Sequence, residues 1–410
     1  MRVFFVNRFY WPETPATGQL LSDLAEGLAA AVHEVVVITA AHRPGVAADE
    51  LRAGVSILRV IRQPQSRAAK LAAFTLFHAA AAFAVLRRAR RGDVVVVMTD
   101  PPLIGVTAGA AALLRGARLV HWVQDIYPEI AATLTRHRWV GVLSGLRNVF
   151  WRRAKACVPL GTDMAAVLAE AGVPAERVRV SPNWAPAGIR DLPRGEPAEL
   201  RETWGLQGKF VIAYSGNLGR VHDLPPVLDL AHELRDDPKF TVLFIGSGAG
   251  EAELRRGVEE RRLTNVRFLP PQPREQLSES LAVADLHLVT LLPGCERLVF
   301  PSKLYGITAA GRPLLFIGPE KCEVARVVRE NGLGLTAERG AMSAAARTIR
   351  GLASYARLWE RYAAAAHAFA ARHTAAAAVA RWSEILHHLD GRHEAPTARL
   401  PGTSGLQPSP

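Results

Sequence analysis

Short runs of Val, Ile, Leu and Phe recur along this chain, separated by alanine-rich stretches long enough to form helices. Continuous apolar runs are typical of strands buried on both faces, and their alternation with helices is the rhythm of a parallel sheet. The predicted strands are Val3–Val6, Val35–Thr39, Ser56–Val60, Val94–Met98, Leu119–Val123 and Ala156–Pro159, then Phe210–Tyr214, Thr241–Ile245, Val266–Phe268, Leu286–Leu291 and Leu314–Ile317. Because each set has the size of one doubly wound domain, the sequence predicts an α/β protein with two Rossmann-like domains.

A segment rich in proline and polar residues, Asn183 to Pro197, separates the two sets of strands and is typical of a linker. We therefore predict a first domain at residues 1–193 and a second at 194–350. We expect the strands to stop after Leu335 and helices to dominate 351–390, packing back toward the first domain with Trp359 and Trp382 as anchors. Residues 391–410 contain few apolar side chains, so we expect a disordered tail.

The formal net charge is +12, and most of it falls in residues 1–194. Such asymmetry indicates a surface that faces anionic lipid, nucleic acid or a polyanionic substrate, although a solvated basic face explains it equally well. No nucleic-acid-binding module is recognisable, which argues against nucleic acid as a partner. Basic residues follow one predicted helix and flank an aromatic pair at 150–151, as in peripheral membrane proteins. These residues are Arg87, Arg88, Arg90, Arg91, Arg147, Arg152, Arg153 and Lys155.

The three cysteines, Cys157, Cys295 and Cys322, lie far apart with no neighbouring histidine cluster, so we expect buried thiols and no metal site. The apolar stretch at Met1 to Val6 is too short for a signal peptide and is followed by the polar residues Asn7 and Arg8, so we predict a cytoplasmic protein. Leu71 to Leu86 is shorter than a membrane-spanning helix needs to be, so we interpret it as a core or interfacial helix.

Ligands of open parallel sheets bind beyond the carboxyl ends of the strands, so the residues after each strand are candidates for a site. Gly18 precedes a predicted helix after the first strand and would admit an anionic group, although a simple turn is the more common role. Asp125 follows Leu119–Val123 and could bind substrate hydroxyls or oppose developing positive charge. The alternative for Asp125 is a helix cap.

Ser215-Gly216-Asn217-Leu218-Gly219-Arg220-Val221-His222 follows the first strand of the second domain. Small residues beside possible cations are suited to a diphosphate, because they admit the phosphates while Arg220 or His222 balances their charge. The glycine-rich segment at 246–250 lacks the third glycine of a dinucleotide fingerprint and is not interpreted as such a site.

Pro301 and Ser302 are predicted to start a short helix that ends at Gly311, with Lys303 adding a positive charge at its first turn. Free backbone N–H groups and a cation at one helix end favour phosphate binding. Glu296, on the loop upstream, could then reach sugar hydroxyls beyond the phosphates, although a loop glutamate is usually only solvated.

In their order and spacing, several segments resemble the retaining glycosyltransferases of family 4, in particular bacterial members that assemble colanic-acid, capsule and O-antigen polysaccharides. The resemblance spans roughly residues 1–390 and rests on Tyr10-Trp11-Pro12-Glu13, His33-Glu34-Val35, Gln124-Asp125-Ile126-Tyr127-Pro128-Glu129, Ser181-Pro182-Asn183-Trp184, Tyr214-Ser215-Gly216-Asn217-Leu218-Gly219, Pro301-Ser302-Lys303-Leu304-Tyr305 and Ala309-Ala310-Gly311-Arg312-Pro313.

The resemblance implies a GT-B fold, in which the two domains face each other across a cleft. The second domain would bind a nucleotide diphosphate sugar as donor substrate, through the loop at 215–222 and through Ser302 and Tyr305, and the first domain would bind a glycan or lipid-linked acceptor. Transfer would need neither metal nor cofactor. Asp125, Glu296 and Lys303 are the implied catalytic residues, and Lys303 would stabilise the departing diphosphate.

The chain departs from the family at Gly306, where a glutamate usually holds the ribose hydroxyls, and at His222, where many relatives have lysine. These changes keep two alternatives open: a non-catalytic nucleotide-sugar-binding scaffold and a GT-B nucleotide-sugar epimerase. The hypothesis of a lipid-linked acceptor adds peripheral attachment at the inner membrane face. The sequence leaves open the sugar, the nucleotide base, the acceptor, the linkage and the oligomeric state.

Overall fold

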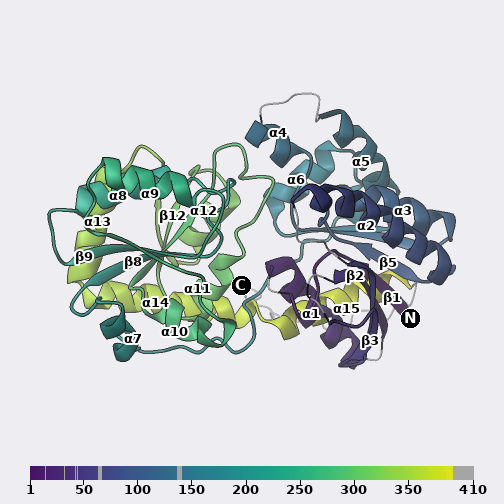
Figure 1. The fold of residues 1–410 in the computed structure, drawn as a ribbon, viewed down its shortest axis with the longest axis horizontal. Coiled ribbons are helices and arrows are strands. Elements are labelled where there is room, and N and C mark those ends of the chain that lie inside the picture. Colours follow the sequence, from purple (N-terminus) through teal and green to yellow (C-terminus); the bar gives the residue numbers. More distant parts are fainter. Residues whose placement is uncertain are drawn as a thin grey trace, which may run out of the picture.

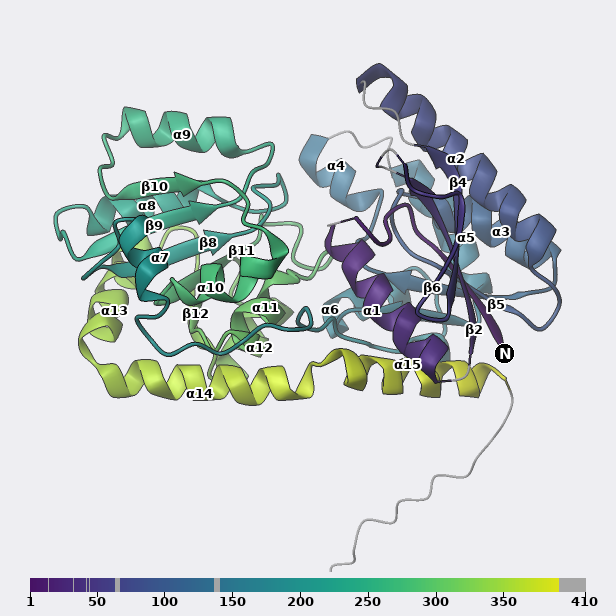
Figure 2. The same ribbon diagram turned by 60° about the horizontal axis from the view of Figure 1, so that its bottom comes forward.

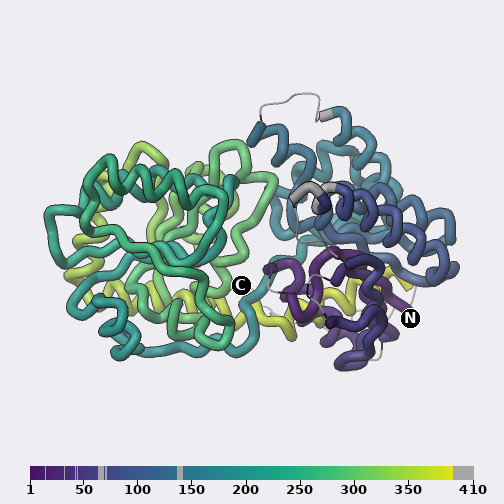
Figure 3. The backbone as a smooth tube through the Cα atoms, viewed as in Figure 1, coloured from purple at the N-terminus to yellow at the C-terminus, as the bar shows by residue number. Residues whose placement is uncertain are grey.

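The computed structural model describes residues 1–13, 15–31, 33–41, 43, 45–62, 67–135 and 141–390, and the predicted tail at 391–410 lies outside this range. The chain forms two lobes, each built on one sheet with helices on both faces (Figure 1). The GT-B fold predicted from the sequence is confirmed. Figure 3 shows the path of the chain through the two lobes.

The N-terminal lobe contains a seven-stranded sheet in the order β3-β4-β2-β1-β5-β6-β7, parallel except where β3 pairs with β4. Its strands are β1 (Arg2–Val6), β2 (Glu34–Ala41), β3 (Asp49–Arg52), β4 (Val55–Arg62), β5 (Val94–Val97), β6 (Arg118–Val123) and β7 (Ala156–Pro159). Its helices are α1 (Ala16–Ala30), α2 (Arg67–Arg88), α3 (Ile104–Leu114), α4 (Glu129–Thr135), α5 (Gly141–Arg153) and α6 (Thr162–Glu170).

The C-terminal lobe contains a six-stranded parallel sheet in the order β10-β9-β8-β11-β12-β13. Its strands are β8 (Phe210–Ser215), β9 (Phe240–Ile245), β10 (Val266–Leu269), β11 (Leu286–Thr290), β12 (Leu314–Ile317) and β13 (Gly334–Ala337). Its helices are α7 (Ala198–Thr203), α8 (Pro225–Leu234), α9 (Glu251–Glu260), α10 (Leu277–Ala282), α11 (Lys303–Ala309), α12 (Glu323–Glu330), α13 (Met342–Ser354) and α14 (Ala356–Arg372).

Each predicted strand is present, with ends that shift by one or two residues, and two edge strands were missed. β3 is the polar sequence Asp-Glu-Leu-Arg and is half exposed, so it carries no apolar signal. β13 begins at Gly334 and is also half exposed, and the expectation that strands stop after Leu335 is wrong because pairing with β12 continues to Ala337. Edge strands need less burial than central ones, and apolar patterns therefore miss them.

The strand order reverses beside β1 in the first sheet and beside β8 in the second. Crevices that receive ligands form at such switch points, beyond the carboxyl ends of the strands. Residues that follow β1 and β6 and residues that follow β8 and β11 line one cavity between the lobes.

The last two helices connect the lobes (Figure 2). α14 packs against α11 of the C-terminal lobe, and α15 (Ala375–Leu389) packs against α1 of the N-terminal lobe. Trp382 and Leu386 of α15 are fully buried in the same cluster as Val3 and Phe5 of β1. The C-terminal helices α14 and α15 thus tie the two lobes together.

The segment that the sequence analysis interpreted as a core or interfacial helix lies within α2. Phe77 and Val85 of α2 are fully buried, whereas Leu76 and Phe83 are more than half exposed. Among the described helices, none is long and apolar enough to cross a bilayer. All three cysteines are free and buried, as expected.

Candidate functional site

A cavity of about 540 Å³ lies between the lobes, at the switch points of the two sheets. From the N-terminal lobe and the linker it is lined by Asp125, by Trp184 and by one face of α1 and its approach: Pro15, Ala16, Gln19, Leu20 and Asp23. The loop after β8 and the segment from Val299 to Ile307 line it from the C-terminal lobe. We call this cavity the cleft.

Lys303, at the start of α11, brings a buried amine to the floor of the cleft. Its Nζ lies 3.4 Å from the centroid of the Tyr214 ring and is buried, and it has no hydrogen-bond partner among the described residues. Burial lowers the pKa of Lys303 well below its ordinary value. A buried ammonium without a partner is costly, so this position favours a ligand that brings negative charge.

The loop after β8 leaves room for such an anion beside Lys303. Gly216 has φ +127°, and a Cβ there would lie 3.7 Å from Lys303 Nζ. The Tyr214 hydroxyl donates to the Asn217 carbonyl at 3.0 Å, which holds the loop in shape. A Cβ on Gly246 would lie 2.0 Å from the Gly216 carbonyl oxygen. The glycine-rich segment at 246–250 therefore serves the close packing of this loop.

His222 does not supply positive charge in this structure. Its Nδ1 lies 3.0 Å from the Thr290 carbonyl oxygen, and since a carbonyl can only accept, Nδ1 carries the proton. Burial, with a smaller contribution from the charge of Lys303, lowers the pKa of His222 to about 3. At that pKa the ring is neutral near pH 7, and the role of Arg220 or His222 in balancing phosphate charge stays a prediction.

Asp125 is one of two aspartates that line the cleft, with Asp23, and it lies where the lobes touch. Its backbone pairs with Val299 in a short antiparallel bridge, and the Ile126 N–H donates to the Leu298 carbonyl at 2.9 Å. Burial, and next the negative charge of Asp100, raises the pKa of Asp125 to about 6. Asp125 can therefore change charge within the range of cellular pH.

Asp100 is a site residue that the sequence analysis missed. It accepts a 2.7 Å hydrogen bond from Arg8 Nε, and burial raises its pKa as well. Since Asp100 follows β5 shortly after the strand ends, the rule that identified Asp125 could have found it. Trp184 was also missed; its Nε1 donates to Asp23 at 3.1 Å, a contact between linker and α1 that no local pattern predicts.

Seven of the predicted residues line the cleft together: Asp125, Ser215, Gly216, Asn217, His222, Ser302 and Lys303. α11 has only seven residues, and the Ser302 side chain does not cap it. The Lys303 side chain is therefore a stronger candidate for anion binding than the helix end.

Four of the predicted residues do not line the cleft. Gly18 is buried, and a Cβ there would lie 3.1 Å from that of Phe9. Gly219 packs beside the Asn217 amide, and Arg220 is exposed. Tyr305 is fully buried, with its ring 6.2 Å from Phe369.

Glu296 also lies away from the Lys303 cleft. It lines a second pocket, and its carboxylate accepts a hydrogen bond from the Gly294 N–H at 2.5 Å. The approach of Glu296 to sugar hydroxyls beyond the phosphates stays a prediction. No group of three or more His, Cys, Asp or Glu side chains suited to a metal ion occurs among the described residues.

Two family models match the chain, one for each lobe. A model described as glycosyl transferase 4-like domain matches residues 17–184, and a model described as glycosyl transferases group 1 matches residues 198–368. WcaI of Escherichia coli K12, named as a colanic acid biosynthesis glycosyl transferase, is 30% identical over 340 residues, 76% of this chain and 82% of WcaI. WbjE of Pseudomonas aeruginosa, named as a glycosyltransferase, is 31% identical over 253 residues, 60% of this chain and 62% of WbjE. The second match thus spans less than two thirds of that relative.

Solved structures share the fold over nearly the whole chain. HepE of Anabaena in complex with UDP-glucose superposes with a TM-score of 0.73 at 17% identity, covering 95% of this chain and 100% of HepE. WaaG, a glycosyltransferase involved in lipopolysaccharide biosynthesis, superposes with a TM-score of 0.70 at 15% identity, covering 94% of this chain and 99% of WaaG. Sucrose-phosphate synthase of Thermosynechococcus elongatus superposes with a TM-score of 0.76 at 14% identity, covering 96% of this chain and 100% of the synthase.

Proposed function

This chain belongs to the family 4 glycosyltransferases, and from that premise we propose that it transfers a sugar, with retention of anomeric configuration, from a nucleotide diphosphate sugar to a glycan or lipid-linked acceptor of a bacterial surface polysaccharide. The observation that carries the proposal is the buried Lys303 amine beside Gly216, which has no hydrogen-bond partner among the described residues. A donor diphosphate would give this amine a partner and favour its charged form.

In the proposed reaction, the acceptor hydroxyl oxygen bonds to the anomeric carbon while the bond from that carbon to the diphosphate oxygen breaks. Negative charge grows on the diphosphate, and Lys303 stabilises it without a metal ion. The acceptor proton passes to the departing diphosphate oxygen. Asp125, when ionised, opposes the positive charge that develops on the sugar ring.

We further propose that the acceptor is presented at an anionic membrane surface. Six large apolar side chains on α2, α3 and α5 are exposed: Leu76, Phe83, Leu86, Leu114, Val142 and Leu146. Arg87, Arg88, Arg152 and Arg153 on α2 and α5 are also exposed. Exposed apolar side chains beside basic ones suit a lipid interface, where each basic residue contributes about 1 kcal/mol.

Arg147 does not belong to that surface. It is buried, forms a two-pronged ion pair with Glu129, and lies 3.6 Å from the centroid of the buried Trp151 ring. The predicted basic and aromatic cluster is thus divided between a structural pair and exposed arginines.

The test is a mass-spectrometric screen of the purified protein with UDP-, GDP- and dTDP-sugars and bacterial lipid extract, with Lys303→Ala in parallel. Release of one nucleoside diphosphate with a mass-shifted glycan, lost in the variant, supports transfer and identifies the donor. Binding without turnover would favour the scaffold alternative suggested by Gly306, and release of an epimerised sugar without acceptor would favour the epimerase.

A further inference from the structure

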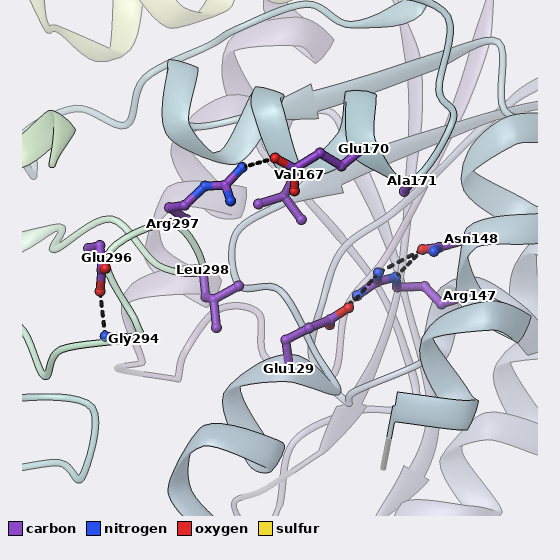
Figure 4. Close-up of a pocket in the computed structure, with 10 residues that line it drawn as sticks. All are labelled: Glu129, Arg147, Asn148, Val167, Glu170, Ala171, Gly294, Glu296, Arg297 and Leu298. Carbon is purple, nitrogen blue, oxygen red and sulfur yellow. Dashed lines mark hydrogen bonds and ion pairs between the residues drawn. The ribbon is translucent and has the colours of Figure 1, made fainter. Parts of the chain in front are cut away.

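A second pocket, with a volume of about 370 Å³, lies beside the cleft (Figure 4). Glu129 of α4, Arg147 and Asn148 of α5, and Glu170 of α6 line it from the N-terminal lobe. Gly294, Glu296, Arg297 and Leu298 line it from the C-terminal lobe. The volume falls within the range of about 300–1,000 Å³ that is typical of small-molecule sites.

One backbone segment joins this pocket to the cleft. Leu298 lines the second pocket and its neighbour Val299 lines the cleft, and both belong to the segment that pairs with Asp125 and Ile126. On the facing lobe, Asp125 lines the cleft and Glu129, four residues later at the start of α4, lines the second pocket. The paired segments at 125–126 and 298–299 therefore form a wall that the cleft and the second pocket share.

The charges in the pocket exclude a strong anion site. Arg147 is paired with Glu129 at 2.5 and 2.9 Å, and Arg297 is paired with Glu170 at 2.5 Å across the two lobes. Figure 4 shows these two pairs on opposite sides of the pocket, with Glu296 apart from both. Among the described residues, no cation forms an ion pair with Glu296. Phosphate or uronate would thus meet cations that are already neutralised and one carboxylate that is not.

The same side chains suit neutral hydroxyl groups. Paired guanidinium and carboxylate groups and the Asn148 amide keep further donor and acceptor positions, and a polyhydroxylated ring can use both kinds. One Glu296 oxygen already accepts from the Gly294 N–H, which orients the carboxylate, and the other can accept from a hydroxyl.

We propose that the pocket between Glu129, Arg147, Glu170, Glu296 and Arg297 binds a neutral sugar ring, as a subsite for the acceptor glycan beside the donor cleft. The assignment of the sugar to the acceptor rests on the proposed transferase function. The binding of a neutral sugar does not.

The test is saturation-transfer NMR of the full chain with methyl β-D-glucopyranoside and methyl α-D-mannopyranoside, and with methyl β-D-glucuronide as the anionic comparison. The matched variants are Glu296→Ala and Arg297→Ala at the pocket, and Glu253→Ala on α9, an exposed glutamate of the same lobe. We expect a saturation-transfer signal for at least one neutral glycoside and a weaker signal for the glucuronide. The signal of the neutral glycoside should be mostly lost in both pocket variants and unchanged in Glu253→Ala.

Three results would overturn the proposal: no saturation-transfer signal for either neutral glycoside, a signal in the pocket variants equal to that of the native protein, or a stronger signal for the glucuronide. A parallel titration with UDP reports on the cleft alone. If UDP does not bind, or binds equally to Lys303→Ala, the transferase proposal fails, while glycoside binding that depends on Glu296 still stands.

Discussion

Asp163 and Glu323 cap each other's helices across the two lobes. The Glu323 carboxylate accepts hydrogen bonds from the N–H groups of Thr162 and Asp163 at 2.8 and 3.0 Å, and the Asp163 carboxylate accepts from the Glu323 N–H at 2.7 Å. A Cβ on Gly161 would lie 2.2 Å from a Glu323 oxygen, so only glycine allows this approach. Since α6 and α12 belong to different lobes, these bonds hold the lobes in their relative positions.

Replacing Glu323 with Ala should therefore loosen the lobes. Two helix N–H groups lose a charged acceptor, and the loss of a cap costs about 0.5–2 kcal/mol. We expect a lower denaturation midpoint together with a larger radius of gyration in X-ray scattering. Asp237→Ala is the control, because the Asp237 carboxylate accepts from the Lys239 N–H within the C-terminal lobe. It should lower stability similarly without changing the radius, and an unchanged radius in Glu323→Ala would contradict the prediction.

Lys303→Met should weaken nucleoside diphosphate binding while leaving the free protein at least as stable. A hydrogen bond to a charged group contributes about 1.5–3 kcal/mol, so we expect affinity to fall roughly 10- to 100-fold. The pKa of Lys303 is lowered by burial, so the unfolded chain binds more protons and stability rises with pH through the interval between the two pKa values.

A bound diphosphate should raise that pKa again, so binding should take up protons and be stronger at lower pH. Calorimetry of UDP binding in buffers of different ionisation enthalpy measures this uptake. We expect it in the native protein and in Lys321→Met, an exposed lysine of the same lobe, and not in Lys303→Met. Equal proton uptake in all three proteins would assign the proton to another group.

The sequence predicted the cleft where a strand end determines it. Asp125 and Ser215 belong together because the carboxyl ends of parallel strands meet at a switch point. The position of Tyr305 follows from helix geometry: it lies two residues after Lys303, about 200° around α11, so its ring faces Phe369 of α14 and does not line the cleft. Glu296 lies on the loop before Val299, which pairs with Asp125 of the other lobe, and no local pattern contains that contact. The roles predicted for both residues stay predictions.

Activity should decline as pH falls below about 6, because the pKa of Asp125 is raised to about 6 by burial and next by Asp100. The same shift means that the folded state binds more protons than the unfolded chain, so Asp125 lowers stability as pH rises through this range. Asp100→Asn removes the neighbouring negative charge and should move the acid limb of the kcat/KM profile to lower pH.

Asp125→Asn should abolish that limb and reduce turnover at every pH. Asp236→Asn, at an exposed carboxylate of the other lobe, should leave the profile unchanged. If Asp100→Asn left the limb in place, the group titrating near pH 6 would not be Asp125.

Leu76→Ser with Phe83→Ser should reduce binding to anionic vesicles. Both side chains are exposed on α2, at 57% and 59%. Burying such a side chain in lipid contributes about 1–2 kcal/mol, so the pair should weaken binding by roughly tenfold or more. Tyr355→Ser, an exposed aromatic of the C-terminal lobe, is the control in the same sedimentation assay. Equal loss in the control would indicate that no particular face docks on lipid.

Gly306 offers a last test of where the donor lies. A Cβ at this position would meet Ile189 and Leu281 at 3.7 and 3.8 Å, which are ordinary contacts, so Gly306→Ala should fold and gain up to about 1 kcal/mol of helix stability. Gly306→Glu adds a carboxylate to the wall of the cleft, where it can accept from ribose hydroxyls if the diphosphate lies at Lys303. We expect the KM for the nucleotide sugar to fall several-fold relative to Gly306→Ala. An unchanged or higher KM would mean that the ribose lies away from α11, and the donor would then have to approach Lys303 from another side of the cleft.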